Sequence, residues 1–254
     1  MHSVHPTPKF SIITVTYNAE KVLEDTIQSV ISQTYHHVEY IIVDGASKDG
    51  TLSIIDRYRS RIHTVISEPD KGLYDAMNKA MDRAKGTYLI FLNSGDKFHA
   101  PETLERIKKA IDDNDVPGIV YGQTNLVDNE GRYLGPRHLT APKDLTYRSF
   151  TNGMVVCHQA FIALARIAPE FNMKYRLSAD YEWCLRCLQH SRKNVFIDDC
   201  LIDYLSEGLS TANRRASLWE RFRIMCRYYG TVPTIIRHVR FAFRFMHTQT
   251  TPSN

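Results

Sequence analysis

The chain has 254 residues, which is long enough for one sizeable domain or two small ones. Hydrophobic residues make up 43% of it and charged residues 24%, a balance that is ordinary for a globular protein and argues against a disordered chain. The net charge of +4 is too small to indicate a partner by itself. Five cysteines, an odd number, do not make a disulfide framework and favour a reducing compartment.

No segment is typical of a secretory leader or a membrane span. Residues 1–8 are polar and proline-bearing and are expected to form a flexible N-terminus. Met1–Phe10 lacks the apolar stretch that a secretory signal needs. No run of about 18 apolar residues, the length that could cross a bilayer, occurs in the chain. The sequence therefore predicts a cytoplasmic protein.

The first hundred residues alternate between short apolar runs and segments with helical periodicity. Helices are predicted to begin at Asn18, a residue type favoured as an N-cap, and at Asp49. A third helix is predicted at Leu73–Ala84. Strands are predicted at Ser11–Val15, Tyr40–Val43, Ile62–Ile66 and Thr87–Leu92. This alternation predicts an α/β fold with a mainly parallel sheet covered by helices on both faces.

The pattern is less regular after Pro101. A helix is predicted at Thr103–Asp112, a strand at Gly118–Tyr121, a hairpin with an acidic turn at Gln123–Leu134, helices at Phe161–Arg166 and Asp180–His190, a strand at Val195–Tyr204 and a basic helical segment at Ala212–Met246. We therefore divide the chain into one domain at 9–211 and a basic helical tail at 212–254. Within the domain, 9–100 is the regular half and 101–211 the less regular half.

Three apolar runs end in polar clusters, at Tyr17–Glu20, Asp44–Thr51 and Asn93–Asp96. Ligands of open α/β sheets bind outside the carboxyl ends of the strands. Three such clusters in the first hundred residues indicate a site for a charged, hydroxyl-rich ligand such as a nucleotide-sugar. The glycines do not form the motifs of dinucleotide or ATP sites.

Two carboxylates of these clusters have specific candidate roles. Asp96, beyond a strand end on a small-residue turn, suits Mg²⁺ or Mn²⁺, and Asn93 can add an amide oxygen. The alternative is an ordinary turn, because these residue types all favour turns. Asp44 ends a buried strand and needs hydrogen-bond donors, which a uracil N–H or a ribose hydroxyl would supply. The alternative for Asp44 is a cap of the following turn.

Four segments together resemble the inverting glycosyltransferases of family 2, and more narrowly the small bacterial members that build exopolysaccharide, of the colanic acid type. The segments are Val15–Asn18, Val43–Thr51, Glu68–Asn78 and Phe91–Asp96. The match covers roughly residues 9–211 and implies the GT-A fold, a nucleotide-binding α/β sandwich. It implies that Asp44 reads the base, that Asp96 holds the metal, and that the nucleotide also contacts Thr16, Asn18, Asp70 and Asn93. The family's metal motif usually begins with Asp, where this chain has Asn93.

The same resemblance implies a catalytic base. An inverting transfer needs a group that takes the proton of the acceptor hydroxyl, and Asp180 matches the family's acidic motif, with Ala179 where the family has Glu. The alternative is an N-cap aspartate. Glu182 is a weaker candidate because it falls on a different face of the helix.

His158 and Gln159 match a His-Gln pair of the resembled subgroup and would contact the diphosphate or the acceptor, with a structural histidine as the alternative. Cys184 and Cys187 have helical spacing, but no second pair follows at zinc-site spacing, so packing is the favoured interpretation.

The last forty residues combine arginines with aromatic and aliphatic residues, and Glu220 is the one acidic residue of 214–246. This composition suits an interfacial helix on anionic lipid. No nucleic-acid motif accompanies the charges, and a solvated helical face is the alternative. We therefore predict peripheral membrane contact through 212–246, on the inner face of the cytoplasmic membrane, and no nucleic-acid partner.

The function predicted from the sequence is inverting transfer of a sugar from a nucleotide-sugar, a UDP-sugar by preference, to a glycan or lipid-linked acceptor in surface polysaccharide biosynthesis. The cofactor predicted is Mn²⁺ or Mg²⁺. The alternatives are a sugar nucleotidyltransferase and a non-catalytic glycan-binding or scaffold protein with the same fold. A homodimer is a further possibility.

Overall fold

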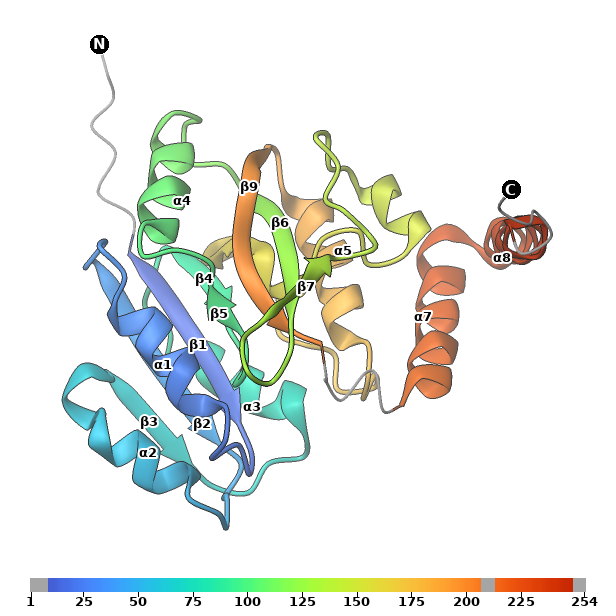
Figure 1. Ribbon diagram of the computed structural model, residues 1–254. Coiled ribbons are helices and arrows are strands. Elements are labelled where there is room, and N and C mark those ends of the chain that lie inside the picture. The colour runs from blue at the N-terminus through green and yellow to red at the C-terminus, as the bar shows by residue number, and fades with distance from the viewer. Residues whose placement is uncertain (1–8, 207–212, 249–254) are drawn as a thin grey trace, which may run out of the picture.

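The computed structural model describes residues 9–206 and 213–248, which form an α/β domain followed by two helices (Figure 1). The predicted flexible segment 1–8 lies outside the described residues. The strands are β1 Phe10–Thr16, β2 Val38–Asp44, β3 Thr64–Ser67, β4 Tyr88–Phe91, β5 Lys97–Phe98, β6 Ile119–Val127, β7 Tyr133–Pro136, β8 Phe161–Leu164 and β9 Asn194–Leu205. They form one sheet in the order β3-β2-β1-β4-β8-β6-β9-β5, with β7 paired to β6.

The strands of the first half, β1 to β4, are mutually parallel, as their apolar runs predict. β8 reverses direction beside β4, and β6 and β9 return to the direction of β1. Six of the nine strands described therefore point the same way, and the sheet is mainly parallel in this sense. The predicted hairpin is confirmed as β6 and β7, which are antiparallel.

Helices cover both faces of this sheet, which explains the continuous apolarity of its strands. The helices are α1 Leu23–Ile31, α2 Thr51–Arg57, α3 Leu73–Met81, α4 Thr103–Asp112, α5 Ala179–His190, α7 Arg214–Tyr229 and α8 Thr231–Thr248. Short 3₁₀ turns are η1 Arg59–Arg61, η2 Tyr147–Asn152, η3 His158–Ala160 and η4 Ala165–Ile167. Buried residues of α1, α2 and α4 share one core on one face, and those of α3, α5 and α7 share a second core on the other.

The helix predicted at Phe161–Arg166 is wrong. Phe161–Leu164 is the strand β8, between β4 and β6, and the 3₁₀ turn η4 follows it. All four residues of β8 are buried. A short apolar run is equally compatible with a buried strand and a buried helix, so the periodicity could not distinguish the two.

The predicted helix start at Asn18 is also wrong, because α1 begins at Leu23. Asn18 has a φ of 48° and its side chain accepts a hydrogen bond from the Lys48 amide, so it joins two loops instead of capping a helix. The start predicted at Asp49 is nearly right: α2 begins at Thr51, and the Asp49 carboxylate accepts the Thr51 amide at 3.0 Å.

The basic tail consists of two helices, separated at Gly230, where φ is +89°. Figure 1 shows them at one side of the molecule, with α8 outermost. α7 packs on the domain, where Ile224 is fully buried and the Glu220 carboxylate accepts the backbone amides of Arg176 and Leu177. Among the described residues, no helix is long and apolar enough to cross a bilayer.

Candidate active site

The loops after β1 and β2 are joined by a network around Asp44. The Asp44 carboxylate is fully buried and accepts hydrogen bonds from the Ser47 amide at 3.0 Å, the Ser47 hydroxyl, and the Ser67 hydroxyl at 2.8 Å. The Ser47 hydroxyl also accepts the Asn18 amide at 2.8 Å. Asp44 therefore caps its own turn, the alternative the sequence left open, and presents this turn at the carboxyl edge of the sheet.

Asp70 lies against the same turn from the segment after β3. Its Oδ1 accepts the Gly72 amide at 2.8 Å. A Cβ atom at Gly45 would lie 2.6 Å from Asp70 Oδ2 and 3.3 Å from a ring carbon of Tyr17. Glycine at position 45 therefore permits the close approach of Asp70 and Tyr17 to the β2 turn. Tyr17 is 61% exposed, so its ring is available to stack on a base.

Asp96 links three segments of the chain. Its Oδ1 accepts the Leu205 amide of β9 at 3.0 Å, and its Oδ2 accepts the Gln159 side-chain amide at 2.7 Å. Gly95, with φ of +97°, forms the turn, and its amide donates to Thr26 in α1. Burial of Asp96 raises the pKa of its carboxyl group to about 7, because its hydrogen bonds come from neutral donors and compensate only in part.

His158 lies next to Gln159 and packs in a cluster of aromatic rings. Its ring stacks on Phe91 with centroids 4.9 Å apart and meets Trp183 edge to face. Burial lowers the pKa of His158 to about 4, against a smaller opposing effect of the Asp180 charge, so the imidazole is neutral at physiological pH.

Asp180 lies in the first turn of α5 and is partly buried. Its Oδ1 accepts the Tyr74 hydroxyl of α3 at 3.0 Å and the Tyr181 amide at 2.8 Å. The pKa of Tyr74 is raised well above its usual value by burial and by the Asp180 charge, so Tyr74 stays a donor. Ser178 precedes the helix as its N-cap residue, so Asp180 is not the N-cap.

The segment around η3 interacts with both candidate carboxylates. The Gln159 side chain donates a hydrogen bond to Asp96, and the negative charge of Asp180 raises the pKa of His158 against the larger effect of burial. The pKa of Cys157 is raised to about 11, mainly by burial, and the charges of Asp96 and Asp180 are among the smaller contributions to this shift. Asp96 and Asp180, which are 84 positions apart in the sequence, thus both act on residues of one short segment, 157–159.

Glu182 and the two cysteines of α5 are not part of this arrangement. Glu182 is buried, accepts the Tyr228 hydroxyl of α7 at 2.5 Å and pairs with Arg186, so it anchors α7. Cys184 and Cys187 of α5 are fully buried in the core that α5 shares with α3 and α7, and burial raises the pKa of both thiols. The packing interpretation of these cysteines agrees with their burial.

Three residues of the candidate site carry buried polar atoms that have no hydrogen-bond partner in the described part of the chain. The atoms are Thr16 Oγ1, Asn93 Oδ1 and His158 Nε2. Buried polar atoms are nearly always paired, so each of these three atoms can accept or share a further partner, such as water, a ligand or an ion. All three residues were singled out from the sequence.

The sequence reasoning missed two residues that the structure brings into the site. Tyr74 contacts Asp180 across 106 positions, and Tyr17 presents its ring beside Gly45 and Asp70. Both residues lie within segments that carry the family resemblance, Tyr17 in Val15–Asn18 and Tyr74 in Glu68–Asn78. This membership was the only signal in the sequence, because neither a long-range hydrogen bond nor an exposed ring leaves a local pattern.

The residues present fit the predicted divalent cation. Asn93 Oδ1 accepts no hydrogen bond in the described chain, and each Asp96 oxygen receives one, which leaves lone pairs on both. Amide and carboxylate oxygens are hard donors that Mg²⁺ and Mn²⁺ prefer. A dication here would also compensate the charge of the buried Asp96.

The family model for glycosyl transferase family 2 matches residues 11–168. The chain belongs to this family. It is 32% identical to a PGL/p-HBAD biosynthesis glycosyltransferase of Mycobacterium tuberculosis, over 72% of this chain and 71% of that protein. It is also 32% identical to TuaG of Bacillus subtilis, which is named for teichuronic acid biosynthesis, over 78% of this chain and 79% of that protein.

Solved structures show the same fold for this family 2 member. TarS 1–349 of S. aureus in complex with UDP-GlcNAc matches with a TM-score of 0.72 at 21% identity, over 85% of this chain and 64% of that one. The mannosyltransferase PcManGT of Pyrobaculum calidifontis, in complex with GDP-Man and Mn²⁺, matches with a TM-score of 0.62 at 18% identity, over 87% and 64%. The chain thus spans less than two thirds of either structure. The predicted GT-A fold is confirmed.

Proposed function

We propose that this family 2 glycosyltransferase transfers a sugar from a UDP-sugar to a hydroxyl of a glycan or lipid-linked acceptor, with inversion, in surface polysaccharide biosynthesis. The observation that carries the proposal is the segment at η3, where the Gln159 side chain binds the Asp96 carboxylate and the charge of Asp180 acts on the neighbouring Cys157 and His158. The names of the relatives from Mycobacterium tuberculosis and Bacillus subtilis support the class of product.

In the proposed reaction Asp180 is the general base. It takes the proton of the acceptor hydroxyl while that oxygen attacks the anomeric carbon, and the bond from that carbon to the diphosphate breaks in the same step. Tyr74 donates to Asp180 Oδ1, which leaves Oδ2 for the acceptor proton. Asp180 is partly exposed, as a group that receives an acceptor must be.

The nucleotide is proposed to lie over the turns after β1 and β2, with Tyr17 against the base and Thr16, Asn18, Asp44 and Asp70 lining the pocket. Asp44 acts through the turn that it fixes, because its carboxylate already holds three donors. The bound UDP-GlcNAc of the TarS structure supports a uridine donor, and the GDP-Man of PcManGT is the competing choice.

Asn93 and Asp96 would hold a divalent cation, Mn²⁺ or Mg²⁺, which neutralises charge on a departing diphosphate when it is bound. His158, neutral and with Nε2 unpaired in the described chain, is proposed to meet the diphosphate or the acceptor. Gln159 would orient the Asp96 carboxylate.

Thermal unfolding with UDP, GDP, dTDP or CMP, each with Mn²⁺, tests the proposal. UDP at a hundred times its Kd should stabilise the protein by roughly 2.7 kcal/mol, more than the other nucleotides do. Asp44→Ala should abolish the shift, whereas Asp56→Ala, an exposed carboxylate on α2, should keep it. The unfolding temperature without nucleotide shows whether Asp44→Ala folds.

Each other outcome removes a different part of the proposal. A larger shift with GDP would overturn the uridine donor and leave sugar transfer standing. No shift with any nucleotide would overturn the nucleotide-sugar donor. Release of pyrophosphate from UTP and a sugar 1-phosphate would identify a nucleotidyltransferase instead.

The two C-terminal helices are proposed to contact the anionic inner face of the cytoplasmic membrane. Val232, Ile235, Ile236 and Val239 on α8 follow helical spacing and are each 46–67% exposed. Trp219 on α7 is 63% exposed, and Arg215, Arg223 and Arg227 of α7 are exposed as well. Exposed apolar side chains together with exposed arginines are what binding to an anionic interface requires.

A further inference from the structure

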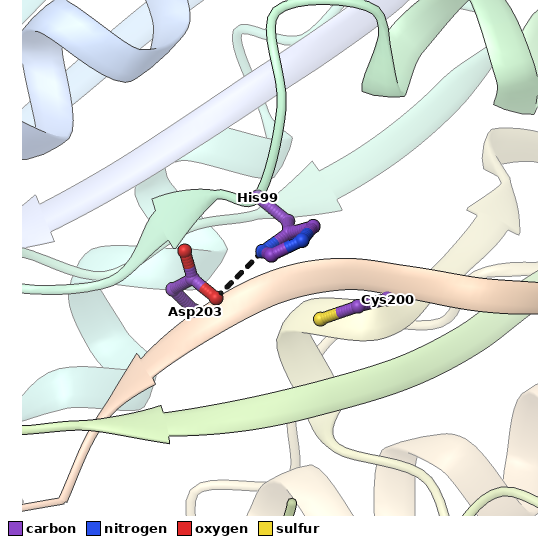
Figure 2. Close-up of side chains that lie close together, drawn as sticks. All are labelled: His99, Cys200 and Asp203. Atoms are coloured by element: carbon purple, nitrogen blue, oxygen red, sulfur yellow. Dashed lines mark hydrogen bonds and ion pairs between the residues drawn. The ribbon is translucent and has the colours of Figure 1, made fainter. Parts of the chain in front are cut away.

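A second group of metal-binding side chains lies outside the candidate active site. It consists of His99, Cys200 and Asp203, and the ligand atoms of the three residues lie within 4.8 Å of one another. Figure 2 shows the imidazole and the carboxylate facing each other, with the sulfur of Cys200 beside them. His99 Nδ1 lies 2.9 Å from Asp203 Oδ1.

An irregularity in β9 puts two of these residues on one side of the strand. Along the pairing with β6, Gln123 faces Cys200 and Thr124 faces Ile202, so Leu201 is an extra residue. Leu201 and Ile202 are therefore both buried in the same core, although neighbours in a regular strand point to opposite faces. Cys200 and Asp203, on either side of them, both remain partly exposed.

His99, the third residue, directly follows the short strand β5, which holds it beside β9. Lys97 pairs with Asp203 and Phe98 with Ile202, and the His99 amide continues the ladder to the Leu201 carbonyl at 2.9 Å. The His99 side chain is 37% exposed, so a metal ion can reach the group from solvent.

We propose that His99, Cys200 and Asp203 form a binding site for Zn²⁺ or a similar divalent transition-metal ion. One nitrogen, one sulfur and one oxygen are donors typical of Zn²⁺, with water as a fourth ligand at this accessible position. On binding, the Cys200 thiol releases its proton to solvent and the thiolate coordinates the ion, while the Asp203 carboxylate turns from His99 to the metal. Hard ions such as Mg²⁺ and Mn²⁺ prefer all-oxygen sites, so the two proposed sites differ in selectivity.

The ion would connect two segments that also meet at the candidate active site. His99 follows Asp96 by three positions, and β9 supplies the Leu205 amide to the Asp96 carboxylate. A metal ion between His99 and β9 would therefore hold β5 against β9 and stabilise the Asp96 turn without touching substrate.

Titration of the metal-free, full-length protein with Co²⁺ under reducing conditions tests the site. One Co²⁺ per chain should give the near-ultraviolet charge-transfer absorption of a cobalt thiolate, which the oxygen ligands of Asn93 and Asp96 cannot give, and one equivalent of Zn²⁺ should remove this absorption. Cys200→Ser should abolish the absorption. His99→Ala should weaken Zn²⁺ binding by about tenfold or more, since loss of an outer-shell partner already costs that much.

Matched control variants test whether other cysteine or histidine residues of the chain bind the metal ion. Cys226→Ser, which changes another partly exposed thiol, should keep the absorption and the affinity. The double variant His2→Ala, His5→Ala should keep them too. The proposal is overturned if the wild-type chain gives no cobalt-thiolate absorption, or if Cys200→Ser and His99→Ala bind Zn²⁺ as tightly as the wild type does. Because Zn²⁺ binding is read without nucleotide or substrate, its failure is separate from a failure of the proposed transfer reaction.

Discussion

His158 shows how one buried side chain makes stability depend on pH. Its pKa is lowered to about 4 by burial, whereas in the unfolded chain it titrates near 6.5. Between these two values the unfolded state binds a proton that the folded state does not. Above pH 6.5, His158 therefore does not lower the free energy of unfolding. As pH falls from 6.5 toward 4, it lowers this free energy by on the order of 3 kcal/mol.

His158→Phe should make the free energy of unfolding less sensitive to acid. Phenylalanine preserves the aromatic contacts with Phe91 and Trp183 and has no proton to bind. Urea unfolding at pH 7 and at pH 4.5 measures the difference, and the buried Asp96 contributes equally to both proteins. The same loss of stability between the two pH values in wild type and variant would contradict a buried neutral His158.

The position of a candidate site residue at the edge of the sheet was predictable from sequence where the residue ends a strand. Asp44, Asn93 and Asp96 follow apolar runs, and the parallel sheet brings such positions to one edge. The hydrogen bonds that occupy Asp44 and Asp96 were not predictable. Ser67 and Gln159 reach them from 23 and 63 positions away, and no local pattern encodes such contacts.

At the level of elements, the turn between β4 and β5 depends on Gly95. Its φ of +97° is strained for any other residue, and an added Cβ would lie 2.6 Å from Leu205 Cδ2. The turn positions Asp96 against β9, so a change at Gly95 acts on the candidate site through the backbone.

Gly95→Ala should destabilise the protein by about 1–2 kcal/mol, because a side chain at positive φ costs this much. It should also weaken the UDP-induced thermal shift, since the Asp96 turn moves. Gly135→Ala is the control, because Gly135 also has positive φ but an added Cβ would have nothing within 4 Å. The control should lose stability and keep the UDP shift. An unchanged UDP shift in Gly95→Ala would show that the turn geometry is not needed for the donor.

Element types were predictable where length and periodicity agreed. Thr103–Asp112 is α4 with the predicted bounds, and the predicted strand Val195–Tyr204 is β9, one residue longer at each end. The helix prediction at Phe161–Arg166 was wrong because Phe161–Leu164 pairs with β4 and β6, which are distant in sequence. The two register shifts of β9 likewise depend on its pairing with β6 and have no local signal.

At the scale of the whole molecule, α7 and α8 lie on the side of the protein opposite to α1 and α2 (Figure 1). α7 is anchored to the domain through Glu220 and Tyr228. Deleting the tail would therefore expose core residues, and substitutions of exposed side chains are the cleaner test of membrane contact.

The triple variant Arg215→Gln, Arg223→Gln, Arg227→Gln should lose co-sedimentation with anionic liposomes. At about 1 kcal/mol for each basic residue near the surface, partitioning falls on the order of a hundredfold. Binding of the wild type should weaken as salt rises, because salt screens exposed charges. The control Arg83→Gln, Lys85→Gln, Arg192→Gln makes the same change in net charge at exposed positions of the domain and should still bind. Absence of wild-type binding at low salt would refute membrane contact.

Inversion by Asp180 is the central claim, and the configuration of the first-formed sugar tests it most directly. Proton NMR of slow UDP-α-GlcNAc hydrolysis by the protein, with Mn²⁺ and before mutarotation, should show the β-anomer first, because water attacks from the face opposite to UDP. Asp180→Asn, which preserves the size of the side chain, should lower the rate by a factor on the order of 100 or more while UDP still stabilises the protein. An α-anomer as the first product, or an undiminished rate in Asp180→Asn, would contradict the account.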